Sequence, residues 1–325
     1  MKLASFEVET DLGRATRLGG VADDTTLVDV TAGYATLLAS KGERSPVEVA
    51  ETMVPPSMIE FLERGERAMD AAREARDFVA GADAEHGPNG ARLRYDVENV
   101  TVLSPVPRPN SIRDYMVVEE HVRNALGEDI PDAWFEMPVY YKGDPDCVAG
   151  PDEDVEWPAY TDQMDYELEL AAVIGKKGRD IAAEDAEEYI AGYTIYNDFS
   201  ARDIQFEEMA ANLGPSKGKD FVGSNAFGPY LVTTDEIDIT SVSMTAQVDG
   251  EVWSDGSLGA MQHSFGDMIE HTSQNLYLHP GDVLGSGTVG KGCGLEMDRY
   301  LEPPEATVEL EVEGIGVLRN RVVTP

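Results

Sequence analysis

A short segment with strict alternation of acidic and apolar residues places the strongest constraint on this chain. Residues 165–170 read Asp-Tyr-Glu-Leu-Glu-Leu. On a β-strand, residues two apart point to the same side of the sheet, so Glu167 and Glu169 lie side by side while the leucines pack beneath them. Two carboxylates that close repel each other unless a cation or protons lie between them. The segment therefore predicts a strand that presents two acids to a cation. The alternative is a solvent-facing strand in a very acidic protein.

A second segment, residues 197–203, brings another carboxylate to the end of a predicted strand. Residues 190–196 form an apolar, strand-like run, and Asp198 follows shortly after it. Ser200 and Asp203 fit a capping box, in which both side chains satisfy free backbone N–H groups at a helix start. Asp198 then lies just before the cap, free to face a site or simply placed near a helix N-terminus. Together the two segments indicate a hard divalent ion held by oxygen ligands.

Charge is the dominant feature of the composition. The chain has 325 residues, a formal net charge of −37 and an apolar fraction of 42%. Such self-repulsion weakens a compact state at low ionic strength, and salt relieves it because the Debye length falls to about 3 Å near 1 M. The apolar content suffices for a packed core and argues against disorder. We therefore expect a halophilic, cytoplasmic protein, with nucleic acid and anionic membranes disfavoured as partners.

Cysteine usage and hydropathy narrow the class further. Cys147 and Cys293 are the two cysteines of the chain. Two cysteines in a chain of this length do not make a disulfide framework, so both are expected to be reduced. The first residues lack a basic region followed by an apolar run, and no window approaches the roughly 18 apolar residues of a membrane span. Neither a signal peptide nor a transmembrane helix is predicted.

The chain divides by pattern into two parts. Residues 1–97 carry short strand-like runs and a helical stretch over residues 57–79, which predicts a small accessory domain. Residues 98–325 mix many strands with a few helices, and residues 248–251 (Val-Asp-Gly-Glu) predict a hairpin because Asp-Gly suits a type I′ turn. Repeats and a regular strand–helix alternation are both lacking. An α+β, mostly β fold is therefore expected rather than a doubly wound one.

A histidine and a lysine add chemistry to these acids. His121 ends a segment, residues 111–121, that follows several prolines and is predicted to be helical. Asp114 would then share a helix face with His121, with about 10 Å of rise between them. The acid would bind a metal ion while the imidazole activates a water, unless His121 is incidental on a surface helix. Lys219 lies in a glycine-bounded loop without Walker A spacing, and beside a metal site it would stabilise an enolate or oxyanion.

Five segments, in this order, resemble the fumarylacetoacetate hydrolase family. Each match is weak alone, but five in register outweigh the structural alternatives for the separate residues. The resemblance runs from about residue 102 to residue 322 and implies a mixed β-roll catalytic domain behind a small N-terminal domain, usually in a homodimer. The matching segments are Asp165–Leu170, Asn197–Gln205, Gly218–Lys219, Pro280–Asp282 and Ser286–Thr288.

The resemblance also implies a metal centre and a base. The ion would be Mg²⁺, with Mn²⁺ or Ca²⁺ as substitutes. His121 would be the general base, oriented by Glu296 as in the longer members of the family; shorter members carry a glutamate where this chain has Asn124. Four carboxylates match the family's metal ligands: Asp114, Glu167, Glu169 and Asp198.

Further matches concern the substrate. Lys219 and Gln205 match residues that polarise the substrate carbonyl, and Thr288 and Tyr141 match substrate contacts. Arg202 lies beside the metal-binding segment, at the edge of the substrate site, and is expected to brace Asp198 or the carboxylate network.

The wall of the expected pocket departs from the family's namesake. Met116 and Met209 replace tyrosines that contact the namesake's substrate, and Ile130 replaces an arginine. Residues 119–134 resemble a lid that closes over the substrate. Fumarylacetoacetate itself is therefore not the expected substrate.

The activity implied by the resemblance is metal-dependent hydrolysis of a C–C bond in an acylpyruvate or another β-diketo acid, through a metal-bound enolate. An alternative on the same site is dehydration of a 2-keto-3-deoxy sugar acid, or decarboxylation or isomerisation of a 2-oxo acid. A second alternative, a non-catalytic metal-binding halophilic protein, is disfavoured because the neutral residues His121, Gln205 and Thr288 accompany the acids.

Overall fold

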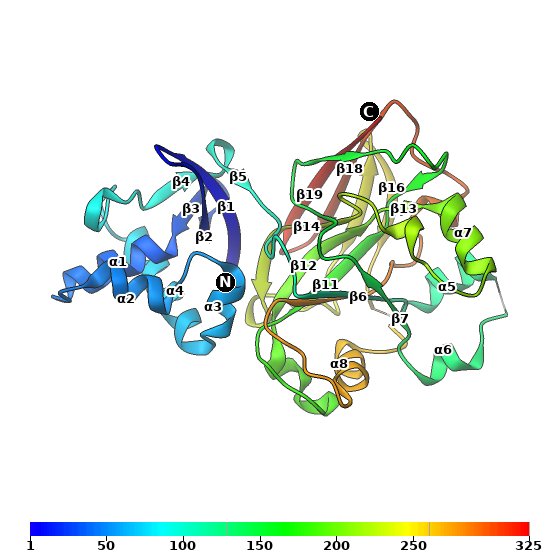
Figure 1. Ribbon diagram of the computed structural model, residues 1–325, viewed down its shortest axis with the longest axis horizontal. Helices are drawn as coiled ribbons and strands as arrows, with labels where there is room; N and C mark the ends of the chain where they lie inside the picture. The colour runs from blue at the N-terminus through cyan, green and yellow to red at the C-terminus, as the bar shows by residue number, and fades with distance from the viewer. Residues whose placement is uncertain (128, 260, 325) are drawn as a thin grey trace.

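The computed structural model describes residues 1–127, 129–259 and 261–324. One large mixed sheet runs through both parts of the chain (Figure 1). Two short strands extend it, β5 (Thr101–Val102) beside β1 and β8 (Val148–Ala149) beside β14. From edge to edge its strands are β4 (Arg94–Asp96), β3 (Thr26–Asp29), β2 (Gly13–Asp23), β1 (Lys2–Thr10), β14 (Asn225–Thr233), β12 (Ile190–Asp198), β11 (Leu168–Ile174), β17 (Asp282–Gly285), β6 (Ser111–Tyr115) and β7 (Tyr140–Gly143).

A second sheet packs against the first and closes the main core. Leu170 and Ile195 of the large sheet belong to the same buried cluster as Leu310 and Leu318 of the second. A two-stranded ladder, β10 (Met164–Asp165) with β13 (Ser200–Ala201), lies apart from both. The strand-rich, α+β character expected from the pattern is confirmed. The second sheet contains β16 (Glu251–Gly256), β15 (Met244–Val248), β18 (Glu305–Val312), β19 (Gly316–Val323) and β9 (Asp154–Glu156).

The β15–β16 connection is the hairpin that the Asp-Gly pair predicts. Val248 pairs with Glu251, and the two central residues have positive φ angles, 50° for Asp249 and 80° for Gly250. Positive φ at both positions is the requirement of a type I′ turn, so a short local sequence determines this register.

The first hundred residues carry their own helices but share the large sheet. β1 pairs antiparallel with β14, Leu3 lying opposite Leu231. The helical stretch expected over residues 57–79 is present as two helices, because Gly65, with a φ angle of 70°, divides it. The division into domains 1–97 and 98–325 stays a prediction. The helices of this region are α1 (Val30–Ser40), α2 (Pro46–Met53), α3 (Met58–Glu63) and α4 (Glu66–Ala80).

The remaining helices surround the end of the large sheet that lies at the right of Figure 1. They are α5 (Glu119–Leu126), α6 (Asp132–Glu136), α7 (Arg202–Ala210) and α8 (Phe265–Ser273). Short 3₁₀ turns are η1 (Pro88–Gly90), η2 (Val97–Asn99), η3 (Ala183–Tyr189), η4 (Lys217–Lys219), η5 (Thr234–Glu236) and η6 (Gly294–Met297). Within the three described ranges, none of the helices combines the length and apolar character that a membrane span requires.

Candidate active site and metal centre

Four buried carboxylates meet where three strands of the large sheet lie near one another. Asp114 is on β6, Glu169 is on β11 and Asp198 ends β12. Glu167 directly precedes β11, where it forms an isolated bridge with Cys293. One oxygen atom from each of the four carboxylates lies within 4.8 Å of the others. As the period of two in the sequence predicts, Glu167 and Glu169 point to the same side and both belong to this cluster.

Two buried cations lie against the carboxylates. The Nζ atom of Lys219, on η4, donates to Oε2 of Glu167 at 2.6 Å and also to Oδ2 of Asp198. Nη2 of Arg202, the first residue of α7, lies 2.8 Å from Oε1 of Glu167 and 2.7 Å from Oδ2 of Asp165. Glu167 is therefore shared between the two cations, while Asp114 and Glu169 contact neither of them in any ion pair of the described residues.

The unequal supply of positive charge appears in the pKa values. Burial, reinforced by the charge of Asp198, raises the pKa of Asp114 well above its usual value. Burial and then Asp114 do the same to the pKa of Glu169. Burial raises the pKa of Asp198 to about 6 in spite of Lys219. Burial also opposes ionisation of Glu167, but the cations of Lys219 and Arg202 outweigh it and lower the pKa of that carboxyl.

These four residues fit a divalent cation. The Oδ1 atom of Asp114 is buried and has no hydrogen-bond partner within the described part of the chain. An orphaned buried oxygen is unfavourable unless something else satisfies it. Carboxylate oxygens are the donors that Mg²⁺, Mn²⁺ and Ca²⁺ prefer. A divalent ion among the four carboxylates would satisfy Asp114 and offset the excess negative charge.

A histidine–glutamate pair stands beside the carboxylates. Nδ1 of His121, on α5, lies 2.8 Å from Oε1 of Glu296, on η6. Oε2 of Glu296 accepts from Nδ2 of Asn124 at 2.7 Å and from the backbone N–H of Lys291 at 2.8 Å. Burial opposes ionisation of Glu296, but the hydrogen bond from His121 and the other donors outweigh it. The pKa of Glu296 is therefore lower than its usual value. An ionised Glu296 holds the proton on Nδ1, which leaves Nε2 of His121 as the basic nitrogen.

The predicted substrate contacts hold the carboxylates in place. The hydroxyl of Tyr141, on β7, donates to both oxygens of Asp198 at 2.8 Å. Oγ1 of Thr288 donates to Oε1 of Glu169 at 3.3 Å. Their contact with a substrate stays a prediction.

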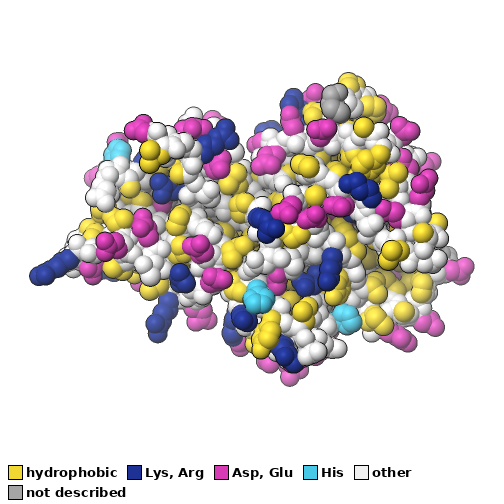
Figure 2. Space-filling model, in the orientation of Figure 1, with side chains coloured by type: hydrophobic (Ala, Val, Ile, Leu, Met, Phe, Trp, Pro, Cys, Tyr) yellow, Lys and Arg dark blue, Asp and Glu magenta, His cyan; other side chains and the backbone are white. Residues whose placement is uncertain are grey.

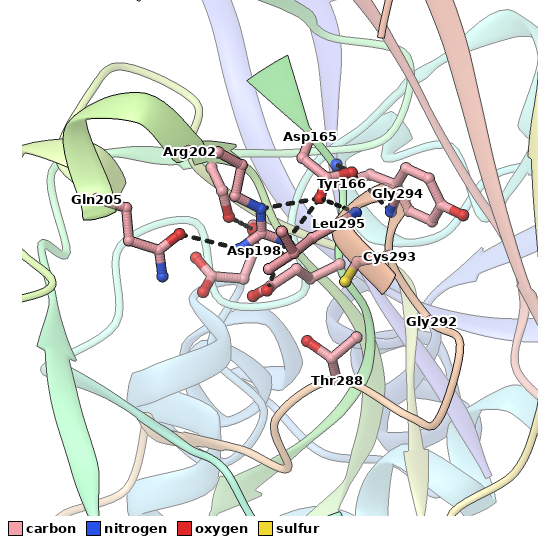
Figure 3. Close-up of polar contacts among 12 residues, drawn as sticks. Asp165, Tyr166, Asp198, Arg202, Gln205, Thr288, Gly292, Cys293, Gly294 and Leu295 are labelled. Atoms are coloured by element: carbon pink, nitrogen blue, oxygen red, sulfur yellow. Dashed lines mark hydrogen bonds and ion pairs between the residues drawn. The ribbon is translucent and has the colours of Figure 1, made fainter. Parts of the chain in front are cut away.

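Arg202 has three polar partners around its guanidinium. It donates from Nη1 to Oε1 of Gln205 at 2.9 Å, on the side away from Asp165 (Figure 3). Among the described residues, these partners are Asp165, Glu167 and Gln205, and Asp198 is not one of them. Arg202 therefore braces the carboxylate network, and Asp198 is held instead by Lys219.

Sequence reasoning gave no role to Asp165, although it opens the alternating segment. Asp165 is fully buried and accepts hydrogen bonds from Nε of Arg202 at 2.8 Å and from the backbone N–H groups of Gly294 and Leu295 at 2.8 and 2.9 Å. It therefore joins the start of α7 to the turn that carries Glu296 (Figure 3). The sequence did carry a signal for this residue, because Asp165 lies two positions before Glu167 and shares the period of two with both predicted ligands.

The prediction that Asp114 and His121 share one helix is wrong. Asp114 lies on β6, paired with Gly285 of β17 and with Tyr141 of β7, and helix α5 begins only at Glu119. Pairing on both edges of β6 overrides the helical periodicity of this segment. Both side chains nevertheless line the same cavity.

The capping box predicted for residues 200–203 is also wrong. Ser200 is on β13 and donates to the backbone oxygen of Asp198 at 3.0 Å. The carboxylate of Asp203 accepts from the hydroxyl of Thr161 and from the backbone N–H of Asp162. Helix α7 begins at Arg202 without a side-chain cap.

A cavity of about 270 Å³ opens onto the site. Glu296 and Asp198 lie behind its wall, in contact with residues that line it. A larger hollow of about 480 Å³ near β1 and β4 includes none of the site residues. The part of the expected lid at residue 128 lies outside the described residues. The predicted site residues on the cavity wall are Asp114, His121, Tyr141, Glu167, Glu169, Arg202, Gln205, Lys219 and Thr288.

Comparison with known proteins agrees with this architecture. Human mitochondrial oxaloacetate tautomerase FAHD2A is 32% identical over 272 residues, covering 83% of this chain and 81% of that protein. The solved fumarylacetoacetate hydrolase of psychrophilic Exiguobacterium antarcticum has a TM-score of 0.71 and 27% identity, covering 99% of this chain and 100% of that one. The 5-carboxymethyl-2-hydroxymuconate delta-isomerase of Mycobacterium smegmatis shares the fold, with a TM-score of 0.67, 23% identity and full coverage of both chains. Residues 111–323 match the profile described as fumarylacetoacetate (FAA) hydrolase C-terminal. The chain therefore belongs to the fumarylacetoacetate hydrolase family.

Proposed function

We propose that this protein hydrolyses a C–C bond in an acylpyruvate or a related β-diketo acid. The observation that carries the proposal is the placement of a His121–Glu296 pair and a four-carboxylate cluster on one cavity. The His121–Glu296 pair can take a proton from water, and the carboxylate cluster can hold a divalent cation beside that water. Each part would be of little use to this reaction without the other.

His121 begins the proposed reaction. Its Nε2 takes a proton from a water molecule while Glu296 stabilises the imidazolium that forms. The resulting hydroxide adds to the distal carbonyl carbon of the substrate, and Lys219 and Gln205 stabilise the oxyanion. The C–C bond to the methylene then breaks, its electron pair passes to the pyruvate fragment as an enolate, and the imidazolium returns the proton. The products are a carboxylic acid and pyruvate.

The metal would supply charge stabilisation. Asp114, Glu167, Glu169 and Asp198 would hold Mg²⁺, or Mn²⁺ or Ca²⁺ in its place, and the bound ion would stabilise negative charge on the enolate oxygen. Tyr141 and Thr288, which donate to Asp198 and Glu169, would fix the orientation of these two ligands.

A second candidate is keto–enol tautomerisation of oxaloacetate. The 32% identity to the human mitochondrial oxaloacetate tautomerase favours it. This reaction needs no water: His121 would move a proton between the carbon and the oxygen of the same enol. The two candidates therefore share a base and differ in their products.

Product analysis tests the proposal. Acylpyruvates, oxaloacetate and 2-keto-3-deoxy sugar acids are supplied separately with Mg²⁺ in molar KCl, and the products are identified by NMR. Pyruvate plus a carboxylic acid supports hydrolysis. Exchange between keto and enol oxaloacetate without cleavage supports the second candidate, and loss of water supports a dehydratase. His121→Ala protein is the control for non-enzymatic conversion, which metal ions alone promote.

Assembly is a separate question. We infer a homodimer from the family resemblance, and light scattering in molar KCl measures the mass directly. A mass of one chain, 35.4 kDa, would contradict it.

A further inference from the structure

We infer that the site selects a 2-oxo acid whose distal arm, the part beyond the reacting carbonyls, is apolar and uncharged. The inference rests on the proposed acylpyruvate chemistry and deepens it by naming the substrate class. It follows from how charge is distributed along the cavity wall.

Both cations of the cavity lie at its carboxylate end, away from the expected position of the distal arm. Among the described residues that line the cavity, Lys219 is the only lysine and Arg202 is the only arginine. The ammonium of Lys219 is bonded to Glu167 and Asp198, and the guanidinium of Arg202 to Asp165 and Glu167. Both side chains are almost fully buried at the carboxylate end, 2% exposed for Lys219 and 1% for Arg202. A second carboxylate on the substrate would find no unpaired cation among these lining residues.

Helix α7 shows where the apolar part of the wall lies. Arg202, Gln205, Phe206 and Met209 all line the cavity, and their spacing puts them on one helix face. Arg202 is buried against the carboxylates, while Phe206 is 39% and Met209 is 37% exposed. Seven residues of helix rise about 10 Å. The face therefore changes from charged to apolar as it leads from the carboxylate cluster to the mouth of the cavity.

Helix α5 shows the same change from polar to apolar residues along the cavity wall. His121 is buried beside Glu296, and Ala125, one turn further along, also lines the cavity. Val139, 37% exposed, lies just before β7 and adds to the same wall. The apolar lining residues are Met116, Ala125, Val139, Phe206, Met209, Pro215 and Leu295.

Desolvation makes this wall selective. A carboxylate pressed against apolar side chains loses water without gaining a counterion, which is strongly unfavourable. An alkyl arm instead covers apolar surface, with a gain of about fourfold in affinity for each methylene buried. The overall net charge of −37 adds repulsion against a doubly charged substrate.

A pair of substrates matched in shape tests the inference. Succinylpyruvate ends in a carboxylate, and 4-methylpentanoylpyruvate replaces that carboxylate with an isopropyl group. We expect kcat/KM to favour the isopropyl compound by roughly tenfold or more. Equal rates, or a preference for succinylpyruvate, would overturn the inference while leaving the hydrolase proposal intact.

A binding measurement keeps the inference testable if neither compound is cleaved. The affinities of 5-methyl-2-oxohexanoate and 2-oxoglutarate, another shape-matched pair, are measured by titration calorimetry with Mg²⁺ present. Tighter binding of the first supports an apolar arm whatever the reaction is. Equal or tighter binding of 2-oxoglutarate overturns it.

Charge placed on the apolar wall should reverse the preference. Met209→Arg supplies a cation at the mouth and is expected to raise the ratio of kcat/KM for succinylpyruvate over its isostere by about tenfold. Ala210→Arg is the matched control, since it adds the same charge to the exposed face of α7 outside the cavity lining. An equal shift in both variants would indicate long-range attraction and would contradict a local apolar wall. In the absence of turnover, the ratio of the two calorimetric affinities replaces kcat/KM.

Discussion

Nδ1 of His121 lies 2.8 Å from Oε1 of Glu296, although the two residues are separated by 175 positions in the sequence. The backbone N–H groups of Lys291 and Gly292 also donate to Glu296, at 2.8 and 3.1 Å. A carboxylate held by several fixed donors cannot rotate away from its histidine. The imidazole therefore has a defined orientation and a defined tautomer before any substrate binds.

Glu296→Gln tests the importance of this pair. Glutamine keeps the size of the side chain but removes the negative charge that stabilises the imidazolium, so kcat should fall roughly 10²- to 10⁴-fold. Steady-state kinetics on the substrate identified by product analysis measures this loss. Affinity for Mg²⁺, measured by calorimetry, should stay unchanged because Glu296 is outside the four-carboxylate cluster.

Removal of the imidazole gives the companion experiment. His121→Ala should abolish turnover and retain Mg²⁺ binding. If both variants lost the metal ion together with activity, the assignment of His121 and Glu296 as base and orienting acid would fail.

Glu169→Gln should weaken the metal centre. Glu169 is fully buried, and its raised pKa reflects burial and the nearby charge of Asp114. Loss of one anionic ligand should reduce Mg²⁺ affinity by roughly tenfold or more, because affinity depends on ligand charge. Calorimetry measures the affinity, and EDTA should abolish the wild-type activity until Mg²⁺ is restored. Glu311→Gln, an exposed acid on β18, is the matched control. Equal affinities in the two variants would exclude Glu169 as a ligand.

Arg202→Met should reduce the stability of the fold itself. The change leaves the buried carboxylates of Asp165 and Glu167 without the guanidinium, which should lower the free energy of unfolding by about 3–5 kcal/mol. Urea unfolding in metal-free buffer measures the difference. Arg321→Met removes an exposed ion pair with Asp154 at 2.6 Å and should lower the free energy of unfolding far less, because water and salt screen an exposed pair. Similar losses in the two variants would contradict a structural role for Arg202.

Local patterns predicted part of this site correctly. The period of two places Glu167 and Glu169 on the same side, and the Asp249-Gly250 pair forms its hairpin, because both depend on neighbours in sequence. Asp198 was expected as a further oxygen ligand because it follows the strand-like run 190–196, and the structure places it with the two glutamates.

Other features depend on partners that local pattern cannot identify. Asp114 is on a strand because β6 pairs with β17, about 170 positions later in the chain. Asp203 accepts from Thr161 and Asp162, about 40 positions earlier, as well as from the N–H of Ile204 in the first turn of α7. The contacts of Asp165 with the 294–295 turn are equally non-local, which explains why its role was missed.

Salt should stabilise this protein strongly. The chain has 62 acidic residues against 25 lysines and arginines, and Figure 2 shows acidic side chains distributed over both halves of the visible face. Repulsion among exposed acids is screened as the Debye length shortens from about 10 Å at 0.1 M to about 3 Å at 1 M salt. The melting temperature should therefore rise steeply with KCl up to about 1 M and more slowly beyond it, because little repulsion is left to screen. Calorimetric melting across a KCl series measures this curve. A glycerol series at constant low ionic strength separates screening from general co-solvent effects, and a melting temperature independent of KCl below 1 M would contradict the prediction.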